Sequence, residues 1–230
     1  MKRAFAVALL ALSAGALEAQ VSPREFSVTT RVGAMSPERS ASMDQSGLVG
    51  LDTEYSFTRW FGLGANVDVA RGNTRREDFV ARYRYGNASV GGGDTIFYQY
   101  LSQPVTTINL GAYGVLRAPS NKLAPFVMAG VGTYSLFLDA QVAGRAERKV
   151  EMSYLAGAGV WYRFSESTGI QLDVRMLQMQ KYDRGFLDPS KGRLPNTVFP
   201  EDFPAVPEAK NTALNTVFSL GFRYIPGGGN

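Results

Sequence analysis

Apolar and polar residues alternate with a period of two along eight segments of the chain, each 11 to 15 residues long. This period is typical of β-strands, because successive side chains point to opposite faces of a sheet. A tilted strand needs roughly 9–11 residues to cross the hydrocarbon of a bilayer, so every segment is long enough to do so. We therefore expect an all-β chain with strands at 25–35, 47–58, 60–71, 105–117, 124–137, 150–164, 169–180 and 212–225.

The connections between these strands alternate strictly between long and short: 36–46, 58–60, 72–104, 118–123, 138–149, 165–168 and 181–211. Short turns at one end and long loops at the other are typical of transmembrane β-barrels. The pattern predicts an eight-stranded antiparallel up-and-down barrel. A hairpin at 79–101, on either side of a glycine-rich turn, leaves an alternative of ten strands if it joins the sheet.

The first nineteen residues have the layout of a secretory signal, with the basic start MKR followed by an apolar run from Ala4 to Leu17. The run is too short to span a bilayer as a helix. We expect cleavage after Ala19, with Ala16 as a second candidate, and a single barrel domain over 20–230. The chain has no cysteine, which excludes a disulfide scaffold and a lipid-anchored lipoprotein.

Ten charged residues lie within the predicted strands, and all of them take the polar parity. Five are arginines and five are acidic, so they can pair when they leave bulk water. A soluble barrel with an apolar interior is the alternative, but its solvated face normally carries lysine and glutamate, and no lysine lies in the strand cores. We interpret the ten as an ion-pair network in the lumen of a membrane barrel: Arg31, Asp52, Glu54, Asp68, Arg117, Glu151, Arg163, Asp173, Arg175 and Arg223.

Aromatic residues of the apolar parity gather at the strand ends beside the short turns. Such a belt is typical of a membrane interface. The sequence predicts a periplasmic aromatic girdle of Phe26, Tyr55, Phe57, Phe61, Tyr162, Phe164, Phe222 and Tyr224. The register of the strand at 124–137 stays open, because PFVMAGVGTYSLF alternates poorly.

A resemblance to a known protein family rests on five segments. They are the signal sequence, the hairpin EYSFTRWFGLGANVDVA, the strands PFVMAGVGTYSL and YLAGAGVWYRF, and the final NTVFSLGFRY. On these segments the chain resembles the small outer-membrane β-barrel proteins, which include the transmembrane domain of outer membrane protein A and outer membrane proteins X and W. The resemblance implies the outer membrane of a Gram-negative cell, with lipid, lipopolysaccharide and the outer-membrane assembly machinery as partners. One departure is that IPGGGN follows Tyr224, where family members often end on an aromatic residue.

Composition limits the chemistry of the chain. It has no histidine and no cysteine, so the usual nucleophile and base pairs and the common transition-metal ligand sets are missing. We expect no enzyme activity, no cofactor and no metal. A mechanism using carboxylates alone is conceivable, but ion pairing explains Asp52, Glu54, Asp68 and Asp173 better. The net charge of +4 argues neither for nor against nucleic acid, and we expect no such partner.

Two functions fit these features. The first is a structural or interaction protein whose lumen is blocked by paired charges and whose long loops contact lipopolysaccharide or an extracellular ligand. The second is a narrow pore or transporter for small or hydrophobic solutes. An eight-stranded interior is just wide enough to be filled by side chains, which favours the first. The basic segment RGNTRRED at 71–78 can grip lipopolysaccharide phosphates or be a solvated loop.

Overall fold

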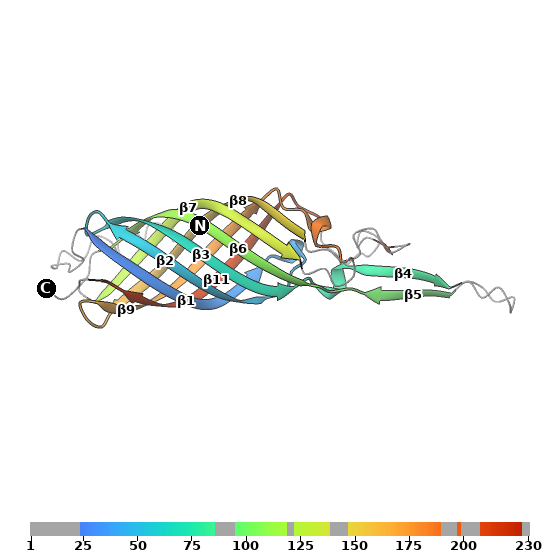
Figure 1. The fold of residues 1–230 in the computed structure, drawn as a ribbon, viewed down its shortest axis with the longest axis horizontal. Coiled ribbons are helices and arrows are strands. Elements are labelled where there is room, and N and C mark those ends of the chain that lie inside the picture. The colour runs from blue at the N-terminus through green and yellow to red at the C-terminus, as the bar shows by residue number, and fades with distance from the viewer. Residues whose placement is uncertain are drawn as a thin grey trace, which may run out of the picture.

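Eight antiparallel strands close into one barrel (Figure 1). The computed structural model describes residues 24–85, 95–118, 122–138, 147–189, 197–198 and 208–226, so the expected leader lies outside the described residues. The barrel strands are Glu25–Pro37 (β1), Ser46–Ser56 (β2), Phe61–Asn73 (β3), Pro104–Arg117 (β6), Leu123–Leu138 (β7), Glu147–Arg163 (β8), Thr168–Gln180 (β9) and Thr212–Tyr224 (β11). The predicted eight-stranded barrel is confirmed.

The strand order is β1-β11-β9-β8-β7-β6-β3-β2, and the first and last strands close the ring. β1 pairs with β11 from Val28 opposite Tyr224 to Pro37 opposite Asn215. Each strand thus has a partner on both sides, which removes the exposed edges that an open sheet would present.

The ten-strand alternative is wrong. β4 (Val80–Tyr85) and β5 (Thr95–Tyr100) form a hairpin that joins β10 (Thr197–Val198) in a separate three-stranded sheet. β3 pairs directly with β6 from Phe61 to Asn73, so the hairpin has no place between them in the barrel. It stands beyond the barrel along the barrel axis (Figure 1).

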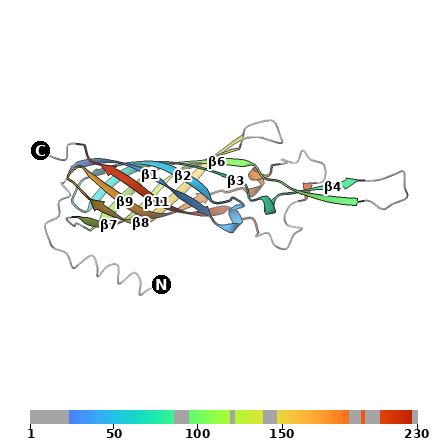
Figure 2. The same ribbon diagram turned by 90° about the horizontal axis from the view of Figure 1, so that it is seen from below.

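The two ends of the barrel differ. At one end, which we call the turn end, the strands are joined by tight turns such as the one in which Phe57 N donates to Phe61 O at 3.0 Å. At the opposite end, the loop end, lie the 3₁₀ turns η1 (Arg39–Ala41), η2 (Arg76–Asp78) and η3 (Arg184–Leu187) (Figure 2). No helix among the described residues is long and apolar enough to cross a membrane.

The outer face of the barrel is apolar over most of its height. In β3 the apolar outward side chains run from Phe61 to Val69, while Asn66 and Asp68 point inward and are buried. These eight steps of about 3.3 Å, at the usual tilt, cover about 20 Å, close to the height of the lipid-facing band of a membrane barrel. The parity inferred from the sequence, with charges inside, therefore holds for this strand.

Candidate functional site

The bore of the barrel contains a central cluster of five charged residues from four strands, Arg31, Asp52, Asp68, Asp173 and Arg175. Arg31 lies between two carboxylates, with Nε 3.0 Å from Asp52 Oδ2 and Nη2 in contact with Asp68 Oδ1. Arg175 contacts Asp52, with Nη1 3.3 Å from Oδ1, and Asp173, with Nε 2.9 Å from Oδ1. Each arginine therefore bridges two carboxylates.

Neutral side chains complete the hydrogen bonding of the central cluster. Asn66 Nδ2 donates to Asp68 at 2.9 Å, Gln171 Nε2 donates to Asp173 at 2.9 Å, and Ser219 Oγ donates to Asp173 at 2.7 Å. A charge that leaves water is tolerated when it is paired and when its remaining hydrogen-bonding capacity is used. Asn66 thus satisfies the Asp68 oxygen that Arg31 does not contact, while Gln171 and Ser219 add to the bonds that both Asp173 oxygens accept from Arg175.

A second cluster, which we call the lower cluster, lies nearer the turn end and consists of Glu54, Arg117 and Arg223. Glu54 contacts Arg117 and accepts two hydrogen bonds from Arg223, at 2.9 and 3.2 Å. The Arg223 guanidinium also lies 4.5 Å from the centre of the Trp161 ring, a cation–π contact. The lower cluster has one positive charge in excess and the central cluster one negative charge, so the charges of the two clusters cancel.

Two of the ten residues predicted for the lumen network lie at the barrel ends and outside both clusters. Arg163 pairs with Glu25 at the turn end, with Nη2 3.2 Å from Oε1. Glu151 lies at the loop end, 4.0 Å from the exposed ammonium of Lys181. Both take the inward parity, but each is near the end of β8, too far along the strand to reach the clusters. Of the ten residues, eight therefore lie in the two clusters, five in the central and three in the lower one, and the other two belong to separate pairs.

One wall of the bore is apolar, which the sequence did not predict. Five buried side chains of β6, β7 and β8 pack together there: Tyr113, Val115, Phe126, Met128 and Leu155. The charged clusters draw most of their members from the other strands. Residues 124–137 are apolar on both parities, so alternation gave no signal. The structure sets the register, with Phe126 and Met128 inward and Val127 and Val131 outward.

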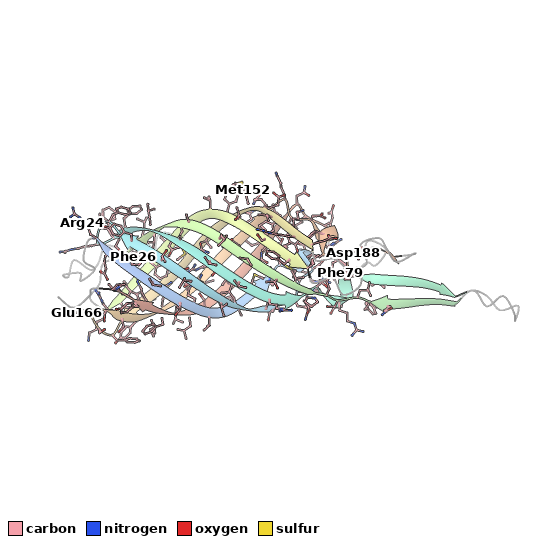
Figure 3. All side chains as sticks on the ribbon, in the orientation of Figure 1. Arg24, Phe26, Phe79, Met152, Glu166 and Asp188 are labelled. Carbon is pink, nitrogen blue, oxygen red and sulfur yellow. The ribbon has the colours of Figure 1, made fainter. Side chains whose placement is uncertain are left out.

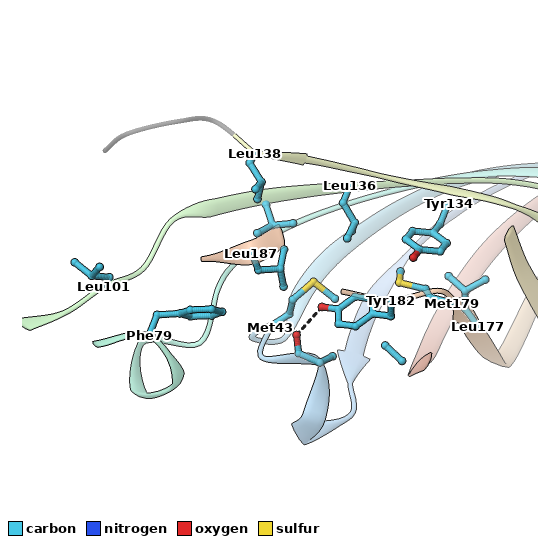
Figure 4. Packing of buried hydrophobic residues seen from close by; sticks show 13 residues of the cluster. Met43, Phe79, Leu101, Tyr134, Leu136, Leu138, Leu177, Met179, Tyr182 and Leu187 are labelled. Carbon is cyan, nitrogen blue, oxygen red and sulfur yellow. Dashed lines mark hydrogen bonds between the residues drawn. The ribbon is translucent and has the colours of Figure 1, made fainter. Parts of the chain in front are cut away.

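The loop end of the bore is filled by a hydrophobic cluster, which we call the loop-end plug (Figure 4). It combines strand ends with loop residues: Ala41, Met43, Phe79, Leu101, Val105, Tyr134, Leu136, Leu138, Leu177, Met179, Tyr182, Leu187 and Ala213. Tyr182 Oη donates to Ala41 O at 2.6 Å, and Gln103 Nε2 donates to Leu187 O at 3.0 Å. These bonds join three loops across the barrel mouth.

The packing at the loop end shifts the pKa values of titratable groups there. Burial raises the pKa of the Tyr182 phenol, because the phenolate is poorly solvated there. Beside the plug, Arg39 of η1 donates to both carboxylate oxygens of Asp78, and this hydrogen bonding raises the pKa of Arg39. The Asp78 side chain is fully buried, so the pair holds the loops that carry η1 and η2 together.

The turn end is closed by a smaller group, the turn-end plug, made of Ala124, Trp161 and Ile225. Ile225 follows the last barrel residue, Tyr224, and its backbone N donates to Ser167 O at 2.8 Å. This bond directs the chain across the turn end of the bore, and the Ile225 side chain is 1% exposed. The first residue after Tyr224 is therefore buried at the turn end of the bore.

Two small cavities lie beside the clusters. A cavity of about 10 Å³ lies beside the lower cluster, between Tyr113, Trp161 and Arg223. Another of about 10 Å³ lies beside the central cluster, between Asp68, Leu155 and Arg175. Each has room for about one water molecule. Among the described residues, no three histidine, cysteine, aspartate or glutamate side chains are grouped to hold a metal ion.

Seven of the eight residues of the predicted aromatic girdle are exposed and Phe61 is partly exposed, and all of them lie in or next to the turn-end parts of the strands (Figure 3 labels Phe26). Ring centroids are 5.0 Å apart for Tyr55 and Phe57 and 5.6 Å apart for Tyr162 and Phe164. Trp60 lies beside Phe61 and is 60% exposed. The sequence reasoning missed Trp60 because the predicted strand at 60–71 gives it the polar parity of Gly62, whereas β3 begins only at Phe61 and leaves Trp60 in the turn.

A comparison with solved structures found several similar chains. Neisserial surface protein A is 13% identical over 86% of this chain and 96% of its own, with a TM-score of 0.54, which shows the same fold. OprG of Pseudomonas aeruginosa is 12% identical over 90% of this chain and 99% of its own, with a TM-score of 0.49. Ail, the attachment invasion locus protein of Yersinia pestis, is 11% identical over 88% of this chain and 100% of its own, with a TM-score of 0.44.

A comparison with curated proteins found no match. A comparison with protein families found one described as the outer membrane protein beta-barrel domain, whose model matches residues 4–225. The matched segment includes all eight barrel strands and both plugs. The chain therefore belongs to the outer membrane protein β-barrel family and is an eight-stranded barrel of the Gram-negative outer membrane.

Proposed function

We propose that this barrel is a closed structural and interaction protein, which acts through its outer face and its extracellular loops and not through its bore. The observation that carries the proposal is that side chains fill the bore at successive levels. The loop-end plug, the central cluster, the lower cluster and the turn-end plug follow one another along the axis. In this family the short turns face the periplasm, so the loop-end plug faces the outside.

The contacts within these layers argue against free passage. An ion that enters from outside meets thirteen buried apolar residues before it meets a charge, and an apolar barrier of this kind is costly for an ion to cross. Deeper in the bore, Arg31 and Arg175 each bridge two carboxylates, so neither is free to bind a passing anion. The cancelling charges of the two clusters also leave no net charge that would attract one ion type.

A narrow pore for hydrophobic solutes is the second candidate. The feature that favours it is the apolar wall formed by Tyr113, Phe126, Met128 and their neighbours. A solute would reach this wall only if one of the plugs moved. The closed arrangement is therefore the better supported of the two.

The residues of the bore also support a non-enzymatic role. The chain has no histidine or cysteine. The lumen carboxylates Asp52, Glu54, Asp68 and Asp173 are each paired with at least one arginine of the bore. We infer that these carboxylates stabilise the barrel and do no chemistry.

The exposed features of the barrel supply the interaction role. The sheet of β10, β4 and β5 projects beyond the loop-end plug (Figure 1), so it is placed to meet a ligand outside the cell. At the other end, the aromatic residues from Phe26 to Tyr224 are placed to anchor the barrel at the periplasmic interface. β11 ends on Tyr224 beside β1, and we propose that the assembly machinery recognises this terminal strand.

Single-channel recording in planar bilayers tests the closed bore. The refolded mature chain is expected to give no steady conductance, whereas a general porin inserted in parallel gives stepwise openings. A matched variant, Ile225→Gly with Trp161→Ala, removes two of the three residues of the turn-end plug. It is also expected to stay silent, because the loop-end plug and the clusters remain. Steady openings of the unmodified chain would overturn the proposal and favour the pore.

A further inference from the structure

The outward positions of the barrel strands carry only two charged residues, Arg71 on β3 and Arg148 on β8. All residues of the eight barrel strands are described, and their burial alternates so that the outward positions can be followed along each strand. Every other charged residue of these strands takes the inward parity. A charged group that faces lipid is costly away from the interface, so this pair calls for an explanation.

The two arginines belong to one row that crosses four neighbouring strands. Arg71 pairs with Thr106 of β6, Thr106 pairs with Phe137 of β7, and Phe137 pairs with Arg148. The three steps between strands, at about 4.8 Å each, separate the two arginine Cα atoms by about 14 Å. We call Arg71, Thr106, Phe137 and Arg148 the basic row.

The basic row lies at the upper limit of the apolar outer band. The next outward row towards the periplasm consists of Val69, Ile108, Ser135 and Val150, in the same register. Because acyl chains cover that lower row, the arginines stand at the level of the lipid headgroups of the outer leaflet.

The Arg148 side chain is held in place by contacts on its own surface. Its guanidinium carbon lies 5.1 Å from the centre of the Phe137 ring, and Nη2 donates to Ser135 Oγ at 3.3 Å. A guanidinium fixed against a ring loses less freedom on binding than a free one. Arg148 is exposed, so the N–H groups at the edge of its guanidinium can donate to an anion from the membrane side.

We propose that the basic row docks the headgroup of a bisphosphorylated glycolipid, the lipid A portion of lipopolysaccharide, with one phosphate at each arginine. This inference rests on the outer-membrane placement of the chain and gives the interaction role a specific ligand class. Lipid A carries a phosphate at each end of a disaccharide, so two guanidinium groups separated along one row can engage both. Arginine suits phosphate because its planar fork donates two parallel hydrogen bonds.

The level of the row favours a lipid over a soluble partner. An occupant must place phosphates at Arg71 and Arg148 while apolar groups cover Val69, Ile108 and Val150 directly below them. An amphiphile of the outer leaflet meets both conditions at once. A phospholipid with one phosphate meets them at a single arginine only, and Thr106 between the arginines offers a hydroxyl to the sugar.

Native mass spectrometry of the refolded full mature chain in detergent tests this site. The chain is titrated with bisphosphorylated lipid A, with monophosphoryl lipid A of the same acylation, and with phosphatidylglycerol. We expect the bisphosphorylated lipid to bind about tenfold more tightly than the other two, since one charge-assisted contact is lost in each of those. This comparison uses the unmodified protein, so it does not depend on a variant folding.

The double variant Arg71→Gln with Arg148→Gln is expected to lose the preference for the second phosphate. Lys181→Gln serves as the matched control, because Lys181 is a highly exposed loop-end cation that lies outside the row. Equal binding of the three lipids to the unmodified chain, or an unchanged preference in the double variant, would overturn the proposal. Neither outcome bears on the conductance of the bore, so the closed-barrel function is tested separately.

Discussion

Arg175 on β9 and Asp52 on β2 contact each other across the bore, with Nη2 2.5 Å from Oδ2. Their strands are not neighbours in the sheet, because β1 and β11 lie between them. The pair therefore links two parts of the barrel wall that no backbone hydrogen bond joins. Both side chains are almost completely buried, so each depends on the other for its solvation.

Replacement of Arg175 by methionine is expected to lower the free energy of unfolding by about 3–5 kcal/mol, because Asp52 and Asp173 lose a bridging cation while buried. Urea unfolding in detergent micelles, followed by the gel shift of the folded barrel, measures this. Lys181→Met, at an exposed cation, should change it by less than about 0.5 kcal/mol. Equal effects of the two substitutions would show that Arg175 does not support the wall.

Two adjacent residues of β3 test which face meets the lipid. Val67→Arg places a charge on the lipid side near the middle of the band and should cost about 2–4 kcal/mol. Asp68→Asn removes a charge from the central cluster, but Arg31 keeps its contact with Asp52, so the cost should be only about 1–2 kcal/mol. Folding yields in lipid vesicles at increasing urea rank the two. The reverse order would invert the assigned faces.

Two glycines of β2 test how tightly the bore is packed. A Cβ at Gly50 would collide with Asp68 Oδ1 and Arg31 Nη2, whereas a Cβ at Gly47 meets nothing within 4 Å. Gly50→Ala should therefore cost about 1–3 kcal/mol through overpacking. Gly47→Ala should be neutral or slightly stabilising, because alanine restricts the unfolded chain more than glycine does. Urea unfolding of the two variants, measured side by side, gives the difference directly, and a neutral Gly50→Ala would contradict the packed bore.

Tyr182 should make the stability of the loop-end plug depend on pH in the alkaline range. Burial raises its folded-state pKa above the ordinary value of about 10, so folding favours the neutral phenol. The stability that this provides is present below about pH 10 and is lost as the pH rises through the folded-state pKa.

Tyr182→Phe tests this dependence. At pH 8 it should lower the free energy of unfolding by about 1 kcal/mol, because the bond to Ala41 O is lost. At pH 11 the unmodified chain should lose about 1.4 kcal/mol relative to Tyr182→Phe, so the difference between them disappears. Urea unfolding at the two pH values measures it. If the difference in unfolding free energy between the two proteins were the same at both pH values, the Tyr182 phenol would be exposed to water.

The strands could be read from the sequence because a membrane barrel imposes strict alternation wherever one face meets lipid and the other meets charge. Asp68 between Val67 and Val69 is such a case, and its inward position follows from parity alone. Parity does not say which charges meet, however. Whether Arg175 reaches Asp52 depends on the stagger between strands that are far apart in the ring, and no local pattern encodes that stagger.

Other features were hidden for different reasons. Phe126 and Met128 line the bore, but their neighbours in sequence are apolar as well, so the alternation that identifies faces is missing. The loop-end plug takes Met43, Phe79 and Tyr182 from loops, where side-chain direction follows from tertiary packing. Arg148 lies before the predicted start of its strand, and Arg71 lies at the very end of its own. Their common row appears only once the register of four strands is known.

The central cluster joins β1, β2 and β3 to β9, and the turn-end plug takes Ile225 from the last residues of the chain. While the chain is being assembled, the carboxylates of the early strands have no counter-ion from the late ones. An incomplete sheet that entered the membrane would then bring unpaired charges into the hydrocarbon. We therefore expect membrane entry to be coupled to ring closure, so that the charges of the interior are neutralised when the first and last strands meet.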